Sequence, residues 1–172
     1  PYYLRAYFAW KRRLPFGFRI CSRGQPGSPP RCGKLRSNLD RPAGGLRRGD
    51  ELSRAQRFFQ RTIAWGVHTG NGRTALNDQR ADFYPVRLGR ESLVPGTIFA
   101  DPYGHILLVT ELLMADEGEG EGGIYAVDGQ PDGTIHRKRF SRSSFLWDPN
   151  PALGGAAFKR FRGLENRFTV VD

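Results

Sequence analysis

The sequence is poor in the residue types that make metal and redox sites easy to recognise. It has two cysteines, three histidines and one methionine among 172 residues. The cysteines and histidines do not occur at the CxxC, HxxxH or HExxH spacings of zinc sites, so neither a metal nor another cofactor is expected. The most apolar run, 106–114, contains Thr110 and Glu111 and is shorter than the roughly 18–20 residues of a membrane-spanning helix. No membrane span is therefore expected.

Acidic residues are scarce in the first half of the chain. Residues 1–90 contain 19 Lys and Arg against 5 Asp and Glu, whereas residues 91–172 contain 8 against 12. The net charge of the whole chain is +10, and 23 of its 27 positive charges are arginines. Such a basic half would attract nucleic acid, an anionic lipid surface or an anionic polymer such as cell wall. An arginine-rich, solvated surface would give the same composition.

Length and composition favour one globular domain over residues 1–172, since 38% of the residues are hydrophobic and 12% are aromatic. The chain begins at Pro1 rather than at Met, and the residues that follow already have a helical pattern. We therefore expect an N-terminally truncated domain, of which a preceding segment is missing.

Two helices are predicted in the first half. The first covers 2–14 and ends before Pro15, and the second runs from Asp50 as its N-cap to Gly66. Between them, 17–49 is rich in Gly, Pro, Ser and Arg and is predicted to be a long irregular loop. The apolar face expected of the first helix is Tyr3, Tyr7, Trp10 and Leu14 with Leu4 and Phe8 beside them. That of the second is Leu52, Ala55, Phe58, Phe59, Thr62 and Ile63.

The second half has the pattern of an antiparallel meander at 93–147, followed by a C-terminal tail at 148–172. An acidic, glycine-rich segment at 115–123 is predicted to be a hairpin tip. Helices followed by such strands define an α+β protein. The strand-like runs, separated by Pro and Gly turns, are 96–100, 105–113, 122–129, 133–140 and 145–148.

One histidine lies at the start of the most apolar strand. If the strands on either side of the acidic tip fold about residue 118, His105 lies opposite approximately residue 131. That register brings Asp128 and Gln130 to the same end of the sheet and to the same face. A histidine beside a carboxylate or amide is the base and orienter of a nucleophilic triad. The alternative is a strand-start histidine in solvent and an unrelated aspartate in a turn.

A nucleophile for such a triad is harder to find. A reactive thiol is favoured at the N-terminus of a helix, where the helix dipole lowers its pKa. Cys21 and Cys32 both fall in the predicted loop, and Cys21 is the better candidate because it follows the first helix closely. The alternatives are a disulfide between the two cysteines in an exported protein, or two reduced structural thiols.

The segments "LVPGTIFADPYGHILLVTEL" and "GGIYAVDGQPDGTIHRKRF" resemble the central strands of the NlpC-type and CHAP-type papain-like cysteine peptidases and amidases. The resemblance covers roughly residues 93–140. It implies a papain-like α+β fold in which N-terminal helices pack on the meander, with His105 as the base and Asp128 or Gln130 as its orienter. "YYLRAYFAWKRRLPF" resembles the body of the helix that the nucleophilic cysteine begins in those families. The resemblance therefore implies that this cysteine lies a few residues upstream of Pro1.

The function expected from this resemblance is hydrolysis of peptide-like amide bonds by a cysteine peptidase or amidase. Cell-wall peptides would suit the family and the basic first half, and they would favour a periplasmic or cell-envelope location in a bacterium. Two alternatives stay open. One is a non-catalytic basic domain that binds an anionic polymer or nucleic acid, and the other is a transglutaminase-like acyl transferase, which uses Cys, His and Asp in the same order.

The basic stretch 136–142 bears on the nucleic-acid alternative. It interleaves basic residues with Phe140, as a strand that contacts nucleic acid does. On a strand, however, Arg137 and Arg139 would face away from Lys138 and Phe140, so a charged edge strand explains the stretch as well.

Overall fold

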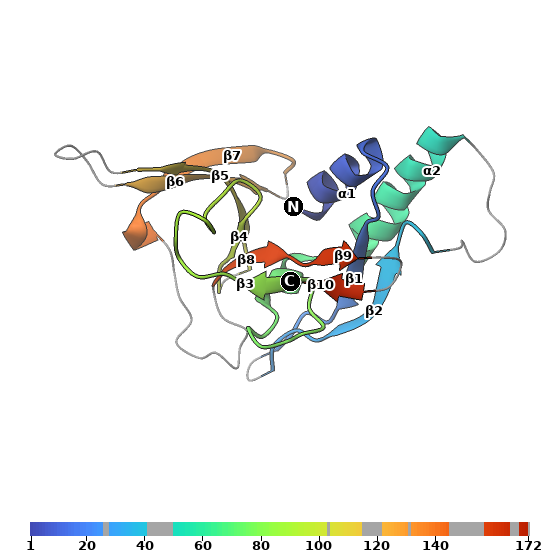
Figure 1. The fold of residues 1–172 in the computed structure, drawn as a ribbon, viewed down its shortest axis with the longest axis horizontal. Helices are drawn as coiled ribbons and strands as arrows, with labels where there is room; N and C mark the ends of the chain where they lie inside the picture. Colours follow the sequence, from blue (N-terminus) through green and yellow to red (C-terminus); the bar gives the residue numbers. More distant parts are fainter. Residues whose placement is uncertain are drawn as a thin grey trace.

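The computed structural model describes residues 1–25, 28–40, 50–102, 104–114, 122–130, 132–144, 157–165 and 169–171. Within these ranges the protein is α+β, as expected, with helices from the first half and mainly antiparallel strands (Figure 1). The helical elements are α1 (Tyr2–Lys11), α2 (Glu51–Arg57), η1 (Phe58–Ile63), α3 (Ala64–Gly66), η2 (Thr69–Arg73) and η3 (Arg142–Ser144). The strands are β1 (Gly17–Cys21), β2 (Cys32–Ser37), β3 (Phe83–Pro85), β4 (Ile98–Ala100), β5 (Ile106–Leu113), β6 (Gly123–Gly129), β7 (Ile135–Phe140), β8 (Ala157–Phe161), β9 (Gly163–Glu165) and β10 (Thr169–Val171).

Six strands form the main sheet in the order β3-β8-β4-β5-β6-β7, and every neighbouring pair is antiparallel. The strands predicted at 96–100, 105–113, 122–129 and 133–140 are confirmed as β4 to β7. The fifth predicted strand, 145–148, and most of the acidic tip, 115–121, lie outside the described residues. In Figure 1, β5, β6 and β7 extend to one side, away from α1 and α2.

The helices and the β1–β2 hairpin enclose the first of two hydrophobic cores, which covers one face of the sheet. Bulky aromatic side chains dominate this core, because strands of the sheet and the β1–β2 hairpin both contribute phenylalanines to it. Its buried members are Tyr2, Ala6, Ala9, Phe16, Phe18, Ile63, Phe83, Ile98 and Ile106.

The buried face of α1 is not the one that its aromatic residues predict. Tyr2, Ala6 and Ala9 are buried, whereas Tyr7 and Phe8 are 41% and 58% exposed. The three buried residues have the same i, i+4, i+7 spacing as the large aromatic ones, and the small side chains of Ala6 and Ala9 allow the helix axis to approach the phenylalanine-rich core closely. The predicted aromatic face therefore lies outside, where part of it contacts η1.

The second predicted helix, 50–66, is confirmed. Asp50 caps it by accepting a hydrogen bond from Ser53 N–H at 2.7 Å. A π-helical segment, η1, interrupts it, and the wider turn changes which side chains face inward. Among the residues predicted to be buried, Ile63 is fully buried but Leu52 is 54% exposed.

Two predictions about irregular segments were wrong. The predicted loop 17–49 contains the antiparallel β1–β2 hairpin, in which Cys21 lies directly opposite Cys32. The predicted tail 148–172 supplies β8, which lies inside the main sheet between β3 and β4. The physical reasons differ. β1 and β2 pair with each other, but their Gly-, Pro- and Arg-rich sequence has little apolar alternation. β8 is short, and its partners β3 and β4 lie far away in the sequence.

A second hydrophobic core covers the opposite face of the sheet. Its buried members come from β4, β5, β6 and β8, and the loop between β3 and β4 adds Val86 and Leu93. This core leaves the β5–β7 end of the face open, and the candidate site lies there. The buried members are Phe99, Leu107, Val109, Ile124, Ala126 and Phe158.

Candidate functional site

A pocket of about 370 Å³ lies on the open end of this face. Its lining combines an apolar part with a group of titratable and polar side chains from the ends of β5, β6 and β7. The lining residues are Phe99, Asp101, His105, Leu107, Ala126, Asp128, Gln130, His136, Lys138, Phe140 and Ser144.

A tight turn between β4 and β5 positions His105. Asp101 Oδ1 accepts hydrogen bonds from the backbone N–H groups of Gly104 and His105 at 2.7 and 2.8 Å. Gly104 has a φ of 106°, which only glycine adopts without strain. The turn therefore fixes the backbone of His105 just before β5 begins, and this explains the Asp-Pro-Tyr-Gly sequence that precedes the histidine.

The β5–β6 register brings the predicted base and orienter together. Leu113 pairs with Gly123, and a bulge between Val109 and Glu111 shifts the register by one residue, so that Leu108 pairs with Val127. The pairing of β5 with β6 is thus centred on residue 118, as the sequence predicts. Extended to the end of the strand, this register places residue 105 close to 130, within one residue of the predicted partner.

His105 Nδ1 lies 3.1 Å from Asp128 Oδ2, and the Gln130 Nε2 group donates a hydrogen bond to the same oxygen at 2.6 Å. Asp128 therefore contacts the imidazole, while Gln130 orients the carboxylate. The side chain of His105 is 51% exposed and that of Asp128 is 18% exposed. A proton on Nδ1 directed at the carboxylate leaves Nε2 as the ring nitrogen that is able to accept a proton.

Four polar residues of the pocket were not predicted as site residues: Asp101, His136, Lys138 and Ser144. His136 pairs with Asp128 across β6 and β7, so the aspartate lies between two histidine-bearing strands. The alternation of 133–140 indicated that His136 and Lys138 share one face of a strand. Placing that face in the pocket also required the β6–β7 register, which the sequence did not provide. Ser144 follows β7 in η3, and no pattern in the sequence links it to the site.

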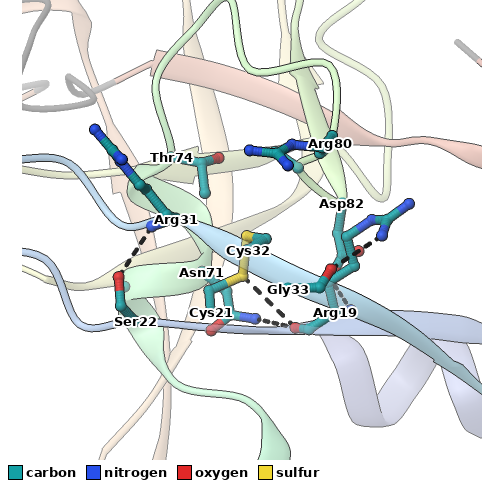
Figure 2. The surroundings of a disulfide bond; sticks show 12 residues. Arg19, Cys21, Ser22, Arg31, Cys32, Gly33, Asn71, Thr74, Arg80 and Asp82 are labelled. Atoms are coloured by element: carbon teal, nitrogen blue, oxygen red, sulfur yellow. Dashed lines mark hydrogen bonds between the residues drawn. A yellow bond between two sulfur atoms is a disulfide. The ribbon is translucent and has the colours of Figure 1, made fainter.

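Cys21 and Cys32 form a disulfide that bridges β1 and β2 (Figure 2). Both residues are buried, at 6% and 7% exposure. A half-cystine has no thiolate, so Cys21 in this disulfide does not act as a nucleophile. This corrects the candidate role of Cys21 and selects the disulfide from the alternatives for these two cysteines.

A buried polar cluster lies beside the disulfide and connects α1 to the sheet. The Tyr2 hydroxyl donates to Asp82 Oδ2 at 2.7 Å, and Arg19 N–H donates to the same oxygen at 2.9 Å. Burial raises the pKa of Asp82 to about 6, although these two donors favour the charged carboxylate. Burial, followed by the charge of Asp82, raises the pKa of Tyr2 well above its usual value. This cluster is part of the scaffold, because none of its members lines the pocket.

The short helix η2 connects the first turn of α1 to the turn that carries His105. The Asn71 side chain donates to the Tyr2 hydroxyl at 3.4 Å. A Cβ on Gly104 would lie 3.7 Å from Thr69 Oγ1, and one on Gly72 would lie only 2.9 Å from Ile106 Cδ1. The structure thus places η2 against both the start of α1 and the start of β5.

A buried lysine holds η2 in this position. The Lys159 ammonium, on β8, donates to the carbonyls of Gly72 and Thr74 at 2.6 and 2.9 Å. The residue is 1% exposed, and its burial lowers the pKa to about 8. A lysine in the predicted tail therefore fixes the segment between α1 and the His105 turn, and nothing in the local sequence indicates that role.

No group of three or more His, Cys, Asp and Glu side chains that is able to hold a metal ion occurs among the described residues. Within the same part of the chain, the helices are too short or too polar to cross a membrane.

Comparison of the chain with protein-family models, with curated proteins and with solved structures gave no match. The fold and the pocket therefore define this protein only as an α+β protein with a histidine–aspartate pair in an open pocket. The resemblance to papain-like peptidases remains a prediction from the sequence.

Proposed function

We propose that this protein is a papain-like cysteine peptidase or amidase, which hydrolyses peptide-like amide bonds. The observation that carries the proposal is the contact between His105 Nδ1 and Asp128 Oδ2 in an open pocket. Such a pair is the base and orienter half of a Cys–His–Asp mechanism.

In this mechanism Asp128 keeps the Nδ1 proton in place and stabilises the imidazolium, and Gln130 limits the rotation of the carboxylate. Nε2 of His105 takes the proton from the thiol, and the thiolate attacks the carbonyl carbon of the amide. His105 then gives that proton to the departing amine, which leaves a thioester acyl-enzyme. Water, deprotonated by His105, attacks the thioester and releases the acid and the thiol.

The nucleophile of the proposal is a cysteine that directly precedes α1 in the parent chain. The resemblance of 1–15 to the helix that the family's cysteine begins supports it, and so does the contact of η2 with both Tyr2 and the His105 turn. At a helix N-terminus the dipole would lower the pKa of the thiol, and backbone N–H groups would hold the oxyanion.

Cell-wall peptides are the proposed substrate, because the first half of the chain is strongly basic and wall polymers are usually anionic. The test is digestion of purified wall peptides by the full-length protein, followed by liquid chromatography and mass spectrometry of the products. Replacing His105 with Ala should lower the rate of amide cleavage by about 10³-fold, which is within the range of lost general-base catalysis. Unchanged cleavage by His105→Ala would refute the assignment.

Arg137→Gln is the matched control, because Arg137 follows the pocket residue His136 on β7 and contacts Glu111 and Tyr125 instead of lining the pocket. It should cleave at the wild-type rate. The same reaction with a low concentration of an added primary amine separates hydrolysis from acyl transfer: the amide of that amine as the main product, in place of the free acid, would favour the transglutaminase-like alternative.

The basic first half also supports a second candidate, a non-catalytic domain that binds an anionic polymer. This candidate predicts binding to anionic wall polymer or nucleic acid that falls steeply with salt concentration and does not depend on His105. Salt-dependent binding combined with no cleavage in the wild-type protein would favour it over the peptidase.

A further inference from the structure

The last strand of the pocket, β7, presents different side chains to its two faces. His136 pairs with Asp128, and Lys138 pairs with Ala126. Cross-strand partners project from the same face, so Lys138 faces the pocket. The Arg137 guanidinium lies on the other face, 3.3 Å from Glu111 Oε2 and 4.4 Å from the centre of the Tyr125 ring. These contacts agree with the alternation predicted for this stretch.

An apolar floor lies beside Lys138. We use this term for the pocket side chains Phe99, Leu107, Ala126 and Phe140. Phe99 pairs directly with Leu107 across β4 and β5, and both are buried in the second core. An aliphatic or aromatic group of a ligand would lose water-exposed surface against this floor, which favours binding.

The charges of the pocket are not equally compensated. Asp101 accepts two backbone hydrogen bonds, and Asp128 accepts from Gln130 and contacts His105. Among the residues that the structure describes, no acidic oxygen lies within 4 Å of the Lys138 ammonium. Lys138 is also two residues along β7 from the partner of Asp128, a separation of about 7 Å. The positive charge is therefore the one that a ligand is able to complement.

We propose that Lys138 and the apolar floor form a binding subsite for a carboxylate attached to an aliphatic chain. The subsite rests on the proposed function for its role, which is to select amide substrates whose acyl group carries a free carboxylate. Binding itself requires no catalysis. Lys138 would pair with the carboxylate, and the floor would hold the chain between Lys138 and His105.

The probes are hexanoate and hexanamide, which share an aliphatic chain of the same length and differ in charge. Binding of each to the full-length protein is measured by NMR titration of the pocket side chains. Hexanoate should bind about three- to fivefold more tightly than hexanamide, the effect of a partly exposed ion pair. Lys138→Gln should make the two dissociation constants equal, whereas Arg137→Gln should preserve the difference.

Lys138→Glu is the second variant, and it should reverse the preference so that hexanamide binds more tightly. Lys138 is exposed, so both substitutions should leave the far-ultraviolet circular dichroism spectrum unchanged. A preference for hexanoate that survives in Lys138→Gln, or its absence in the wild-type protein, would overturn the subsite.

The two proposals fail in different ways. A Lys138-dependent preference for hexanoate in a protein that cleaves no amide supports the subsite and removes the peptidase. His105-dependent cleavage without any preference for hexanoate removes the subsite and leaves the peptidase in place.

Discussion

The two faces of the main sheet carry different kinds of residue, although they come from the same strands. Ile98 and Ile106 are buried in the core formed with α1 and the β1–β2 hairpin. Their chain neighbours Phe99 and Leu107 belong to the second core, and His105 lies at its open end. Alternation along one strand thus separates a face used for packing from a face with room for a ligand.

The two faces also differ in how they treat a carboxylate. Asp82 is 7% exposed and is held by Tyr2 and Arg19, whereas Asp128 is 18% exposed and contacts His105, a half-exposed base. Both aspartates have hydrogen-bond donors. What separates them is access, because only the partner of Asp128 is open to solvent and to a substrate. Substitutions at matched positions on the two faces should therefore have opposite effects on activity and stability.

Asp128→Asn should have the largest effect. It should lower the rate of amide cleavage and leave the stability of the fold nearly unchanged. The amide would no longer stabilise the imidazolium and would favour the wrong tautomer of His105, so cleavage should fall by about 10³- to 10⁴-fold. The free energy of unfolding should change by less than about 1 kcal/mol, because the side chain lies at the pocket wall. Steady-state kinetics of the full-length protein and denaturant unfolding check the two parts. A large loss of stability would show that Asp128 is a structural residue.

Phe18→Ala should have the opposite profile. Phe18 is fully buried in the helix-covered core, and its removal should lower the free energy of unfolding by about 3–5 kcal/mol. Phe8→Ala, on the exposed side of α1, is the matched control and should cost less than about 1 kcal/mol. Urea titration followed by circular dichroism measures both. Equal losses would mean that the exposed face of α1 is covered by another part of the protein.

Asp82 should give the helix-covered face a distinctive pH dependence. Its pKa is about 6 in the folded protein and near 3.8 in the unfolded chain, so folding favours the protonated form. The contribution of Asp82 to the free energy of unfolding should therefore be fully present below about pH 4. It should decrease by up to about 3 kcal/mol as the pH rises through about 6. Asp82→Asn should flatten this part of the curve. Chemical denaturation at several pH values, compared between the two proteins, is the measurement.

Removing the disulfide should destabilise the scaffold without removing the nucleophile. The double substitution Cys21→Ser with Cys32→Ser opens a loop with a sequence separation of 11, and should lower the free energy of unfolding by about 2–3 kcal/mol. Amide cleavage, measured under conditions where the variant stays folded, should remain within about twofold of wild type. Complete loss of cleavage in a folded variant would return Cys21 to the list of candidate nucleophiles.

Much of the β5–β7 unit could be predicted from the sequence. The apolar run at 106–113, the acidic tip and the Asp-Gly turns limit the strands and their register, and that register is enough to bring His105 to Asp128. The β-bulge near Thr110 was not predictable, since no Gly or Pro marks it. It moved the register by one residue, which is smaller than the reach of the two side chains.

The wrong predictions have two origins, a weak local pattern and long-range packing. Periodicity identified α1 but led to the wrong prediction that its aromatic face is buried, because hydrophobic spacing does not say which of two apolar faces meets the core. β1 and β2 pair with each other and were missed because Gly, Pro and Arg residues hide their strand pattern. β8 was missed because it is short and its partners β3 and β4 lie far along the chain. Lys159 shows this most clearly: a charged residue in a predicted tail is buried and bonds to the carbonyls of Gly72 and Thr74.

Local sequence therefore determined the elements whose partners are close in the chain: the capped helix at 50–66, the Asp101–His105 turn and the β5–β6 hairpin. The residues that contact each other in these elements are separated by short stretches of chain. Local composition and alternation therefore strongly restrict the structures that these elements adopt. Tertiary packing decided which face of α1 is buried, where β8 lies, and which side chains join His105 and Asp128 in the pocket. These depend on contacts between segments far apart in sequence, for which no local pattern carries the information.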